Sequence, residues 1–148
     1  MFSEENANLL KEAFAAFNAR DLDRWQGFYT DDIVVRNTLN PLPVQGKEEA
    51  RKQVEDLFDA FPDAHIEITN LVSSGDQVAI ETEFRGKNTG ILNNPGMPPL
   101  PATDREVRVP GSAFVTIRDG KIANVRQFPD GLGMMRQLGL MEGAPEAG

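Results

Sequence analysis

The stretch EVRVPGSAFVTIRDGKIANVRQF, residues 106–128, decides the fold, because its pattern predicts two long strands joined by one tight turn. Apolar and polar residues alternate on both sides of Asp119 and Gly120, and an Asp-Gly pair between alternating runs is a strong hairpin signal. Pro110 removes a backbone donor and Gly111 permits a bend, so we expect a β-bulge here. Such a bulge would curve the sheet and give it a concave face.

Two more strands are predicted before this hairpin. Residues 65–72 and 78–85 alternate at the period of a strand, and Ser73-Ser74-Gly75-Asp76 between them supplies a turn. Consecutive strands joined by short turns pair antiparallel. The second half of the chain is therefore expected to form a curved antiparallel sheet.

The first sixty residues have helical spacing instead. We expect one helix with Glu4 and Glu5 in its first turn and an apolar stripe from Leu9 to Phe17. A second helix is expected to begin at the cap residue Asp21, and a third to lie between Gly46 and Pro62. A short strand over residues 33–35 separates the last two. Helices followed by a run of strands are typical of an α+β domain in which the sheet wraps around the N-terminal helices.

The length and composition of the chain indicate what class of protein it is. The chain has 148 residues, a length that predicts a single domain over residues 1–148, in which residues 141–148 form a tail with little to pack. There is no cysteine. The N-terminal MFSEENANLL has acids where a secretory signal would be basic, so we expect a cytoplasmic protein.

The net charge limits the classes of partner that the protein is expected to bind. The chain has fifteen basic and twenty-three acidic residues, which gives a formal net charge of -8. No cluster of basic residues is long enough to follow a phosphate backbone. We therefore expect neither nucleic acid nor a membrane as a partner. A neutral or weakly polar small molecule fits better.

A long loop interrupts the strand pattern. The segment GKNTGILNNPGMPPLPATDR, residues 86–105, is rich in Gly, Pro and Asn but contains several apolar residues. Loops of this length in a compact domain are uncommon and often functional. We expect a partly ordered lid over a cavity enclosed by the curved sheet.

Asp130 is the main candidate for chemistry, because it stands where the last strand runs into the apolar segment GLGMMRQLG. Alternation predicts one face of that strand with Ile122, Asn124, Arg126, Phe128 and Asp130, and the other with Ala123, Val125 and Gln127. An acid at this position can cap the following helix. It can also be a buried general acid or base in an apolar pocket. The two interpretations are compatible.

Three charged residues project from one face of another strand: Glu81, Glu83 and Arg85. A solvated face with a cross-strand ion pair is the simpler interpretation. If this face lined the cavity, Glu83 and Asp130 would instead form a pair of carboxyl groups suited to one acid and one base.

The aromatic residues and the single histidine have simpler interpretations. Trp25 and Tyr29 lie one helical turn apart and fit core positions, although a buried Tyr hydroxyl needs a hydrogen-bond partner. His65 fits a solvated strand position. One histidine without clustered acids predicts no metal site.

Several motifs resemble the SnoaL-like polyketide cyclase family of the nuclear transport factor 2-like superfamily. They are FYTDDIVVRN in the first half, FRGKNTG before the proline-rich loop, VPGSAF after it, and IRDGKIANVRQFPDGLGMMRQLG at the end. The last motif is the most specific part, and the resemblance covers roughly residues 7–140. It implies a cone-shaped α+β barrel, frequent homodimers, and neither a metal nor an organic cofactor.

The resemblance also implies a reaction. The best-studied members of the family close a polyketide ring by intramolecular aldol condensation, with an acid/base Asp at the position of Asp130. The ligand is expected to be a hydrophobic, carbonyl-bearing small molecule. We expect substrate contacts from Trp25, Tyr29, Asn37, Glu83, Asn88 and Arg126.

The sequence departs from the family pattern at two positions. Many members have a histidine where this chain has Asn88, and another in the first strand, where Arg36 and Asn37 stand. Asparagine can orient a carbonyl group but cannot exchange protons. A non-catalytic module that binds a small molecule is therefore the alternative from a different functional class.

Two other enzymes share the expected fold. Ketosteroid isomerase chemistry is disfavoured, because its general base would fall near Asn37 and its second acid near Ala113. A limonene epoxide hydrolase-like addition of water to an epoxide is the other alternative. Asp130 and Glu83 would then be its two acids. Glu81 stands near the place of its arginine, so Arg85 would have to substitute for that residue.

Overall fold

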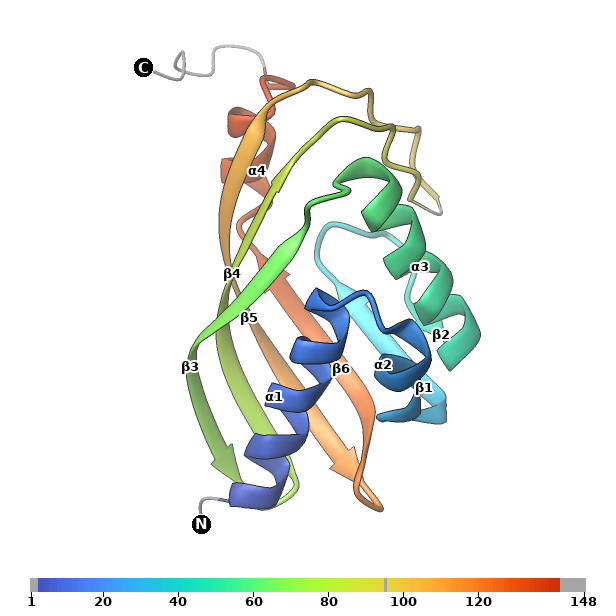
Figure 1. The fold of residues 1–148 in the computed structure, drawn as a ribbon, viewed down its shortest axis with the longest axis vertical. Helices are drawn as coiled ribbons and strands as arrows, with labels where there is room; N and C mark the ends of the chain where they lie inside the picture. Colours follow the sequence, from blue (N-terminus) through green and yellow to red (C-terminus); the bar gives the residue numbers. More distant parts are fainter. Residues whose placement is uncertain (1–2, 95, 142–148) are drawn as a thin grey trace.

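The computed structural model describes residues 3–94 and 96–141, so the predicted tail lies outside the described residues except for residue 141. The elements follow the predicted order, with one added strand of two residues (Figure 1). They are α1 (Glu4–Asn18), α2 (Leu22–Gly27), β1 (Tyr29–Asn37), β2 (Val44–Gln45), α3 (Lys47–Ala60), β3 (His65–Ser74), β4 (Gln77–Lys87), β5 (Glu106–Arg118), β6 (Lys121–Pro129) and α4 (Gly131–Gln137).

The strands form one sheet in the order β2-β1-β6-β5-β4-β3. β3 to β6 pair antiparallel, as predicted. β1 differs, because it pairs parallel with β6 and antiparallel only with the short β2. The sheet is therefore mixed, and it ends at β2 and β3 without closing into a barrel.

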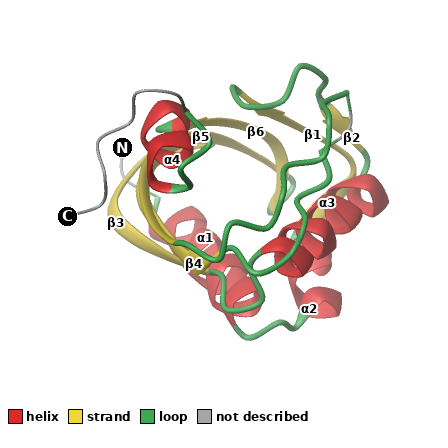
Figure 2. Ribbon diagram, turned by 90° about the horizontal axis from the view of Figure 1, so that it is seen from above, coloured by secondary structure: helices red, strands yellow, loops and turns green. Residues whose placement is uncertain are grey.

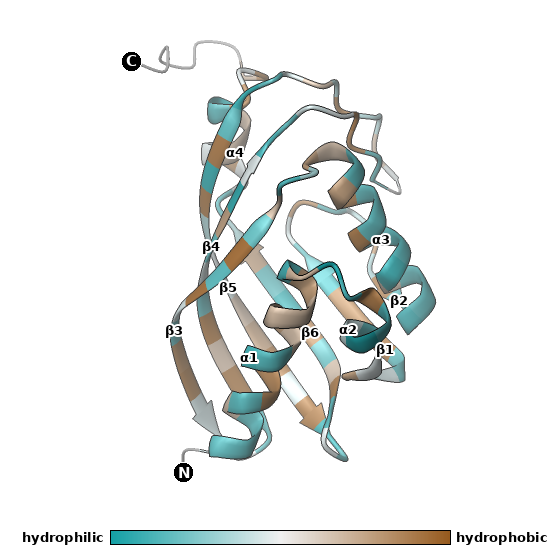
Figure 3. Cartoon of the chain, viewed as in Figure 1, coloured by the Kyte–Doolittle hydropathy of each residue, from teal (hydrophilic) through white to brown (hydrophobic). Residues whose placement is uncertain are grey.

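The sheet curves around the helices. Seen from above, it forms an arc, with α1, α2 and α3 inside and below it (Figure 2). Hydrophobic and hydrophilic residues alternate along the long strands, as expected when one face of a sheet packs on a core and the other meets water (Figure 3). This confirms the predicted α+β fold with a concave face.

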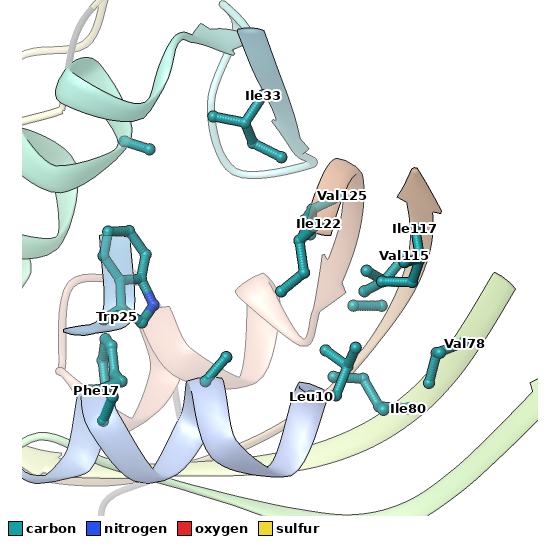
Figure 4. Packing of buried hydrophobic residues seen from close by; sticks show 14 of the residues in the cluster. Leu10, Phe17, Trp25, Ile33, Val78, Ile80, Val115, Ile117, Ile122 and Val125 are labelled. Atoms are coloured by element: carbon teal, nitrogen blue, oxygen red, sulfur yellow. The ribbon is translucent and has the colours of Figure 1, made fainter. Parts of the chain in front are cut away.

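Local signals place the first helix. The Ser3 hydroxyl accepts a hydrogen bond of 3.3 Å from the Asn6 N–H, and Glu4 and Glu5 lie in the first turn, where acids favour the helix dipole. The helix buries Leu10 beside Ile80 of the sheet and Phe17 beside Trp25 of α2 (Figure 4).

Two clusters of buried side chains form the core. The first core cluster lies between the helices and the inner face of the sheet and includes Leu10, Trp25, Ile80, Val115 and Ile122 (Figure 4). The second core cluster joins α4, the end of α3 and the 88–104 loop, through Phe61, Leu92, Val107, Met134 and Leu138. The second cluster fills the α4 end of the molecule.

The expected bulge at Pro110 and Gly111 is not present. Pairing between β4 and β5 continues without a shift, with Pro110 opposite Glu83. The Pro110 carbonyl faces β6 and accepts a hydrogen bond from the Asp130 N–H. The Pro110 nitrogen, which has no hydrogen to donate, faces the same side, where β6 ends at Pro129. A proline there removes no ladder bond. The irregularity lies instead at the other end of β5, between Thr116 and Ile117.

Candidate functional site

An interior cavity of about 80 Å³ lies between the helices and the inner face of the sheet. Its lining residues are Leu10, Phe14, Trp25, Tyr29, Val35, Ala50, Gln53, Val54, Ile80, Ala113, Val115, Ile122, Val125 and Gln127. None of these residues is an acid, an arginine, a lysine or a histidine. The cavity is therefore apolar, and its polar groups come from Trp25, Tyr29, Gln53 and Gln127.

Tyr29 is the titratable side chain of this cavity. Burial raises the pKa of Tyr29 well above its ordinary value of 10.0, and a hydrogen bond with Trp25 opposes this effect only in part. The two rings lie 4.6 Å apart at their centroids. Tyr29 is thus a neutral phenol at physiological pH, able to donate a hydrogen bond into an apolar space.

A bulge in β6 decides which side chains reach the cavity. Ile122 pairs with Ile117, but the next pair joins Asn124 to Thr116, which leaves Ala123 as an extra residue. Ile122, Val125 and Gln127 consequently share the inner face. The alternation predicted for this strand was wrong on this point, because it placed Ile122 opposite Val125 and Gln127.

Asn37 ends β1 beside this inner face. Its Nδ2 donates a hydrogen bond of 2.8 Å to Gln127 Oε1, and its Oδ1 accepts one of 2.8 Å from the Leu39 N–H. Asn37 was predicted as a substrate contact. Its own polar atoms are engaged, and it reaches the cavity through Gln127, which the sequence did not single out.

Asp130 caps α4, which confirms the structural interpretation of this residue. Its Oδ1 accepts a hydrogen bond of 2.8 Å from the Gly133 N–H. The side chain is exposed and does not line the interior cavity. The expected burial against a pocket wall was wrong, because the strand ends at Pro129 and the carboxyl group turns toward the first turn of α4.

Glu83 lies on the outer face of the sheet, away from the cavity. One of its oxygens lies 3.7 Å from Arg85 Nε and 3.6 Å from Arg108 Nη1. Ile80 and Phe84 of the same strand face the core. The solvated ion-paired face is therefore confirmed for Glu83 and Arg85, and a carboxyl pair of Glu83 with Asp130 inside the cavity was wrong.

Asn88 is 2% exposed and holds the 88–104 loop in place. Its Nδ2 donates to the carbonyl oxygens of Ala60 and Gly90, and its Oδ1 accepts from the N–H and the hydroxyl of Thr103. All the hydrogen bonds that this amide can form are used within the protein. The geometry gives Asn88 a role in loop structure and leaves no polar atom free for a substrate.

Arg126 is exposed on the outer face, with its guanidinium 5.4 Å from the centre of the Phe114 ring. It lies opposite Arg36 of β1, and both line a groove of about 300 Å³ under the 38–43 loop. Asn37 and Phe128 also border this groove. Arg126 and the interior cavity therefore lie on opposite faces of the sheet.

His65 is exposed at the start of β3, as predicted. Within residues 3–94 and 96–141, no group of three or more His, Cys, Asp or Glu side chains is placed to hold a metal ion. No helix in these ranges is long and apolar enough to cross a membrane.

Comparison with known proteins relates this geometry to a family. Residues 8–138 match the model of the SnoaL-like polyketide cyclases. Two aklanonic acid methyl ester cyclases are each 30% identical over 141 residues: DauD of Streptomyces sp. (strain C5) and DnrD of Streptomyces peucetius. The match covers 94% of this chain, 84% of DauD and 94% of DnrD.

The fold has a close counterpart among solved structures. TsrD from Streptomyces laurentii superposes with a TM-score of 0.79 at 25% sequence identity, over 95% of this chain and 99% of that one. The likeness in fold thus extends over nearly the whole of both chains.

Proposed function

Because this chain belongs to the SnoaL-like polyketide cyclase family, we propose that it closes a ring in a hydrophobic, carbonyl-bearing small molecule by cofactor-independent intramolecular aldol condensation. One observation carries the proposal: the interior cavity is apolar and free of charged side chains, and its few polar groups can hydrogen-bond a carbonyl oxygen. Binding sites for small hydrophobic ligands have this composition.

The cavity holds part of such a ligand. Its volume of about 80 Å³ is below the range of roughly 300–1,000 Å³ typical of ligand pockets. A single ring fits, and a larger molecule must extend from it. The α4 end offers a direction, because β6 leads from Gln127 in the cavity wall to Asp130 three residues later.

Asp130 is the proposed acid/base group. Its Oδ1 is occupied by the helix cap, whereas Oδ2 makes no hydrogen bond within the described residues. Gly133 has no side chain at the point where a Cβ would meet that carboxyl group. In the aldol step a carbon that lies between two carbonyl groups loses a proton to Asp130. This carbon then bonds to the carbon of a different carbonyl group in the same molecule. The oxygen of that carbonyl then takes the proton.

A binding module without turnover is the second candidate. The uncharged lining of the cavity favours it, because no acid or base other than Tyr29 lies within the cavity wall. The epoxide hydrolase alternative receives no such support. Glu83 and Arg85, its required second acid and arginine, pair with each other on the outer face.

The variant Asp130→Asn separates the two candidates. Asparagine caps helices as well as aspartate does, so thermal stability should not change. Aklanonic acid methyl ester, the compound in the names of the two relatives, is the first substrate to test. Its binding can be followed by fluorescence of Trp25, because this is the single tryptophan of the chain.

A catalyst should lose turnover by about 100-fold or more in Asp130→Asn while it keeps its affinity for the compound. Asp21→Asn is the matched control, because Asp21 caps α2 in the same manner, with a hydrogen bond of 3.2 Å from the Arg24 N–H. Full turnover in Asp130→Asn would contradict the proposed role. Binding without any turnover in the natural protein would favour the binding module.

We further propose that the protein acts in the cytoplasm and that, as the family implies, it forms a homodimer. The outer face of the sheet supports the second point, because Phe114 and Phe128 are 43% and 45% exposed there. Their rings contact each other edge to face, with centroids 6.2 Å apart. Exposed neighbouring aromatic rings are typical of protein interfaces.

A further inference from the structure

We infer that Gln127 binds a carbonyl oxygen of the ligand through its Nε2 amide group, and that Asn37 is the positioning residue that fixes this amide. The inference rests on the proposed function, since it names the group that holds the carbonyl-bearing ligand in the interior cavity. It is carried by one chain of hydrogen bonds and by the place of Gln127 in the cavity wall.

The orientation of Gln127 follows from a single backbone donor. The Leu39 N–H can only donate, so the Asn37 atom that faces it must be the oxygen Oδ1. The Asn37 atom that faces Gln127 is then Nδ2, which can only donate. Gln127 must therefore present Oε1 to Asn37, at 2.8 Å, and its Nε2 lies on the other branch of the amide.

This arrangement leaves a hydrogen-bond donor available. Gln127 lines the interior cavity and also borders the groove beside Arg126, and no acceptor in the described parts of the chain engages its Nε2. An amide N–H in an apolar space costs free energy unless it finds a partner. A carbonyl oxygen supplies that partner, whereas a ligand group that can only donate does not.

The turn that contains Leu39 is itself held in place. The Asn40 N–H donates to the Asn37 carbonyl at 2.9 Å. Leu39 packs so closely against Gly131 that a side chain at position 131 would collide with it. Both the start of α4 and the end of β1 therefore hold the donor that orients Asn37.

The position of Gln127 separates its role from that of Asp130. Three residues of a strand span about 10 Å, so a carbonyl oxygen bound by Gln127 is remote from a carbon that reacts at Asp130. Gln127 thus anchors the ligand. Its substitution should raise KM by more than it lowers kcat, whereas the reverse is expected for Asp130.

The variant Asn37→Asp tests the inference by reversing the amide. Aspartate still accepts from the Leu39 N–H, but it has no N–H to donate to Gln127. The Gln127 amide should then turn, donate Nε2 to residue 37, and present Oε1 to the cavity. The cavity should then prefer ligands that donate a hydrogen bond, whereas the natural cavity prefers ligands that accept one.

Two five-membered rings of the size of the cavity serve as probes: cyclopentanone, which only accepts hydrogen bonds, and pyrrole, whose N–H donates. Their dissociation constants are measured by Trp25 fluorescence or by NMR titration. We expect the natural protein to prefer cyclopentanone over pyrrole by about tenfold and Asn37→Asp to reverse this preference.

Two variants keep the inference testable if Asn37→Asp does not fold. Gln127→Glu leaves Asn37 intact and presents a carboxylate oxygen to the cavity, so it should also prefer pyrrole. Gln127→Met should show no preference. Thr38→Asp is the matched control, because it adds the same charge at an exposed neighbouring position and should keep the natural preference.

Equal affinities in the natural protein, an unchanged preference in Asn37→Asp or Gln127→Glu, or binding of neither probe would overturn the inference. These results are independent of turnover. If Asp130→Asn abolishes turnover but the preference does not reverse, the inference fails and the proposed function stands. If the preference reverses and no turnover exists, the cavity donor is supported and the proposed function fails.

Discussion

At the scale of single residues, Tyr29 has the side chain whose surroundings most change its chemistry. It is the first residue of β1 and lines the interior cavity, and burial raises its pKa above the ordinary value. It is also the single tyrosine of the chain, so an absorbance titration of tyrosinate reports on this one group.

We predict that Tyr29 in the folded protein stays protonated at pH values where a free tyrosine ionises. In the unfolded chain the phenol loses its proton from about pH 10, so above this pH the unfolded state binds fewer protons than the folded state. The free energy of unfolding should therefore fall as the pH rises above about 10, by as much as about 1.4 kcal/mol per pH unit. Chemical denaturation at several pH values measures this slope.

Tyr29→Phe is the control for this prediction. Phenylalanine keeps the ring contact with Trp25 but has no proton to lose. The part of the slope above pH 10 that belongs to Tyr29 should vanish in the variant. An identical slope in both proteins would show that other groups cause the alkaline loss of stability.

At the scale of elements, one buried side chain organises the 88–104 loop. Asn88 ties the loop to the end of α3 through Ala60 and closes the loop's base through Thr103. The bridge between Leu92 and Leu100 holds the next part of the loop. A segment rich in glycine and proline thereby acquires a defined course over the second core cluster.

We predict that Asn88→Ala frees this loop. The four side-chain hydrogen bonds would be lost and buried backbone groups left without partners, at a cost of about 1–3 kcal/mol in the free energy of unfolding. Backbone amides of residues 89–104 should exchange with deuterium faster than in the natural protein. Asn93→Ala, an exposed position of the same loop, should leave both measurements unchanged.

The elements differ in how far the sequence determines them. Helix caps and hairpin turns are local, so the cap by Asp21, the turn at Asp119-Gly120 and the cap by Asp130 could be predicted from the residues alone. The bulge at Ala123 is not local. It arises because β6 pairs with β5 in one register at Ile122 and in another from Asn124 onward. No residue type at position 123 marks the shift.

The same distinction between local signals and contacts made only in the fold applies to the site residues. Trp25 lies on α2 as expected, but the helical position expected for Tyr29 was wrong, because α2 ends at Gly27 and Tyr29 is the first residue of β1; both side chains line the cavity. Gln127 and Arg126 were misjudged, since a shift of one residue exchanges the inner and outer faces of a strand. Asn88 was misjudged because its partners lie 2 to 28 residues away and are brought together only by the fold.

At the scale of the whole molecule, the outer face of the sheet has a continuous row of side chains across neighbouring strands. The register places Arg126 beside Phe114, Phe114 beside Ala79, and Ala79 beside Val72. Val72 is 57% exposed. The middle of this row is apolar and open to water, which is the composition expected of a surface that a second copy covers.

We predict that the natural protein sediments as a dimer and that Phe114→Glu sediments as a monomer. Because Phe114 is 43% exposed, a glutamate there should disturb the monomer little, but two copies would bring buried charges together at the interface. Ile91→Glu is the control, since Ile91 is 55% exposed but lies in the 88–104 loop. A dimer that persists in Phe114→Glu would locate the interface elsewhere.

The parallel pairing of β1 with β6 also constrains the order in which the chain can fold during its synthesis. β1 forms its main ladder with residues 122–127, about ninety positions later, and its other neighbour is the two-residue β2. The N-terminal third therefore leaves the ribosome without its partner strand. Until β6 emerges, the strand that carries Val35 and Asn37 can pair only with the two residues of β2. A nascent chain cut before residue 121 should therefore be unable to enclose the cavity.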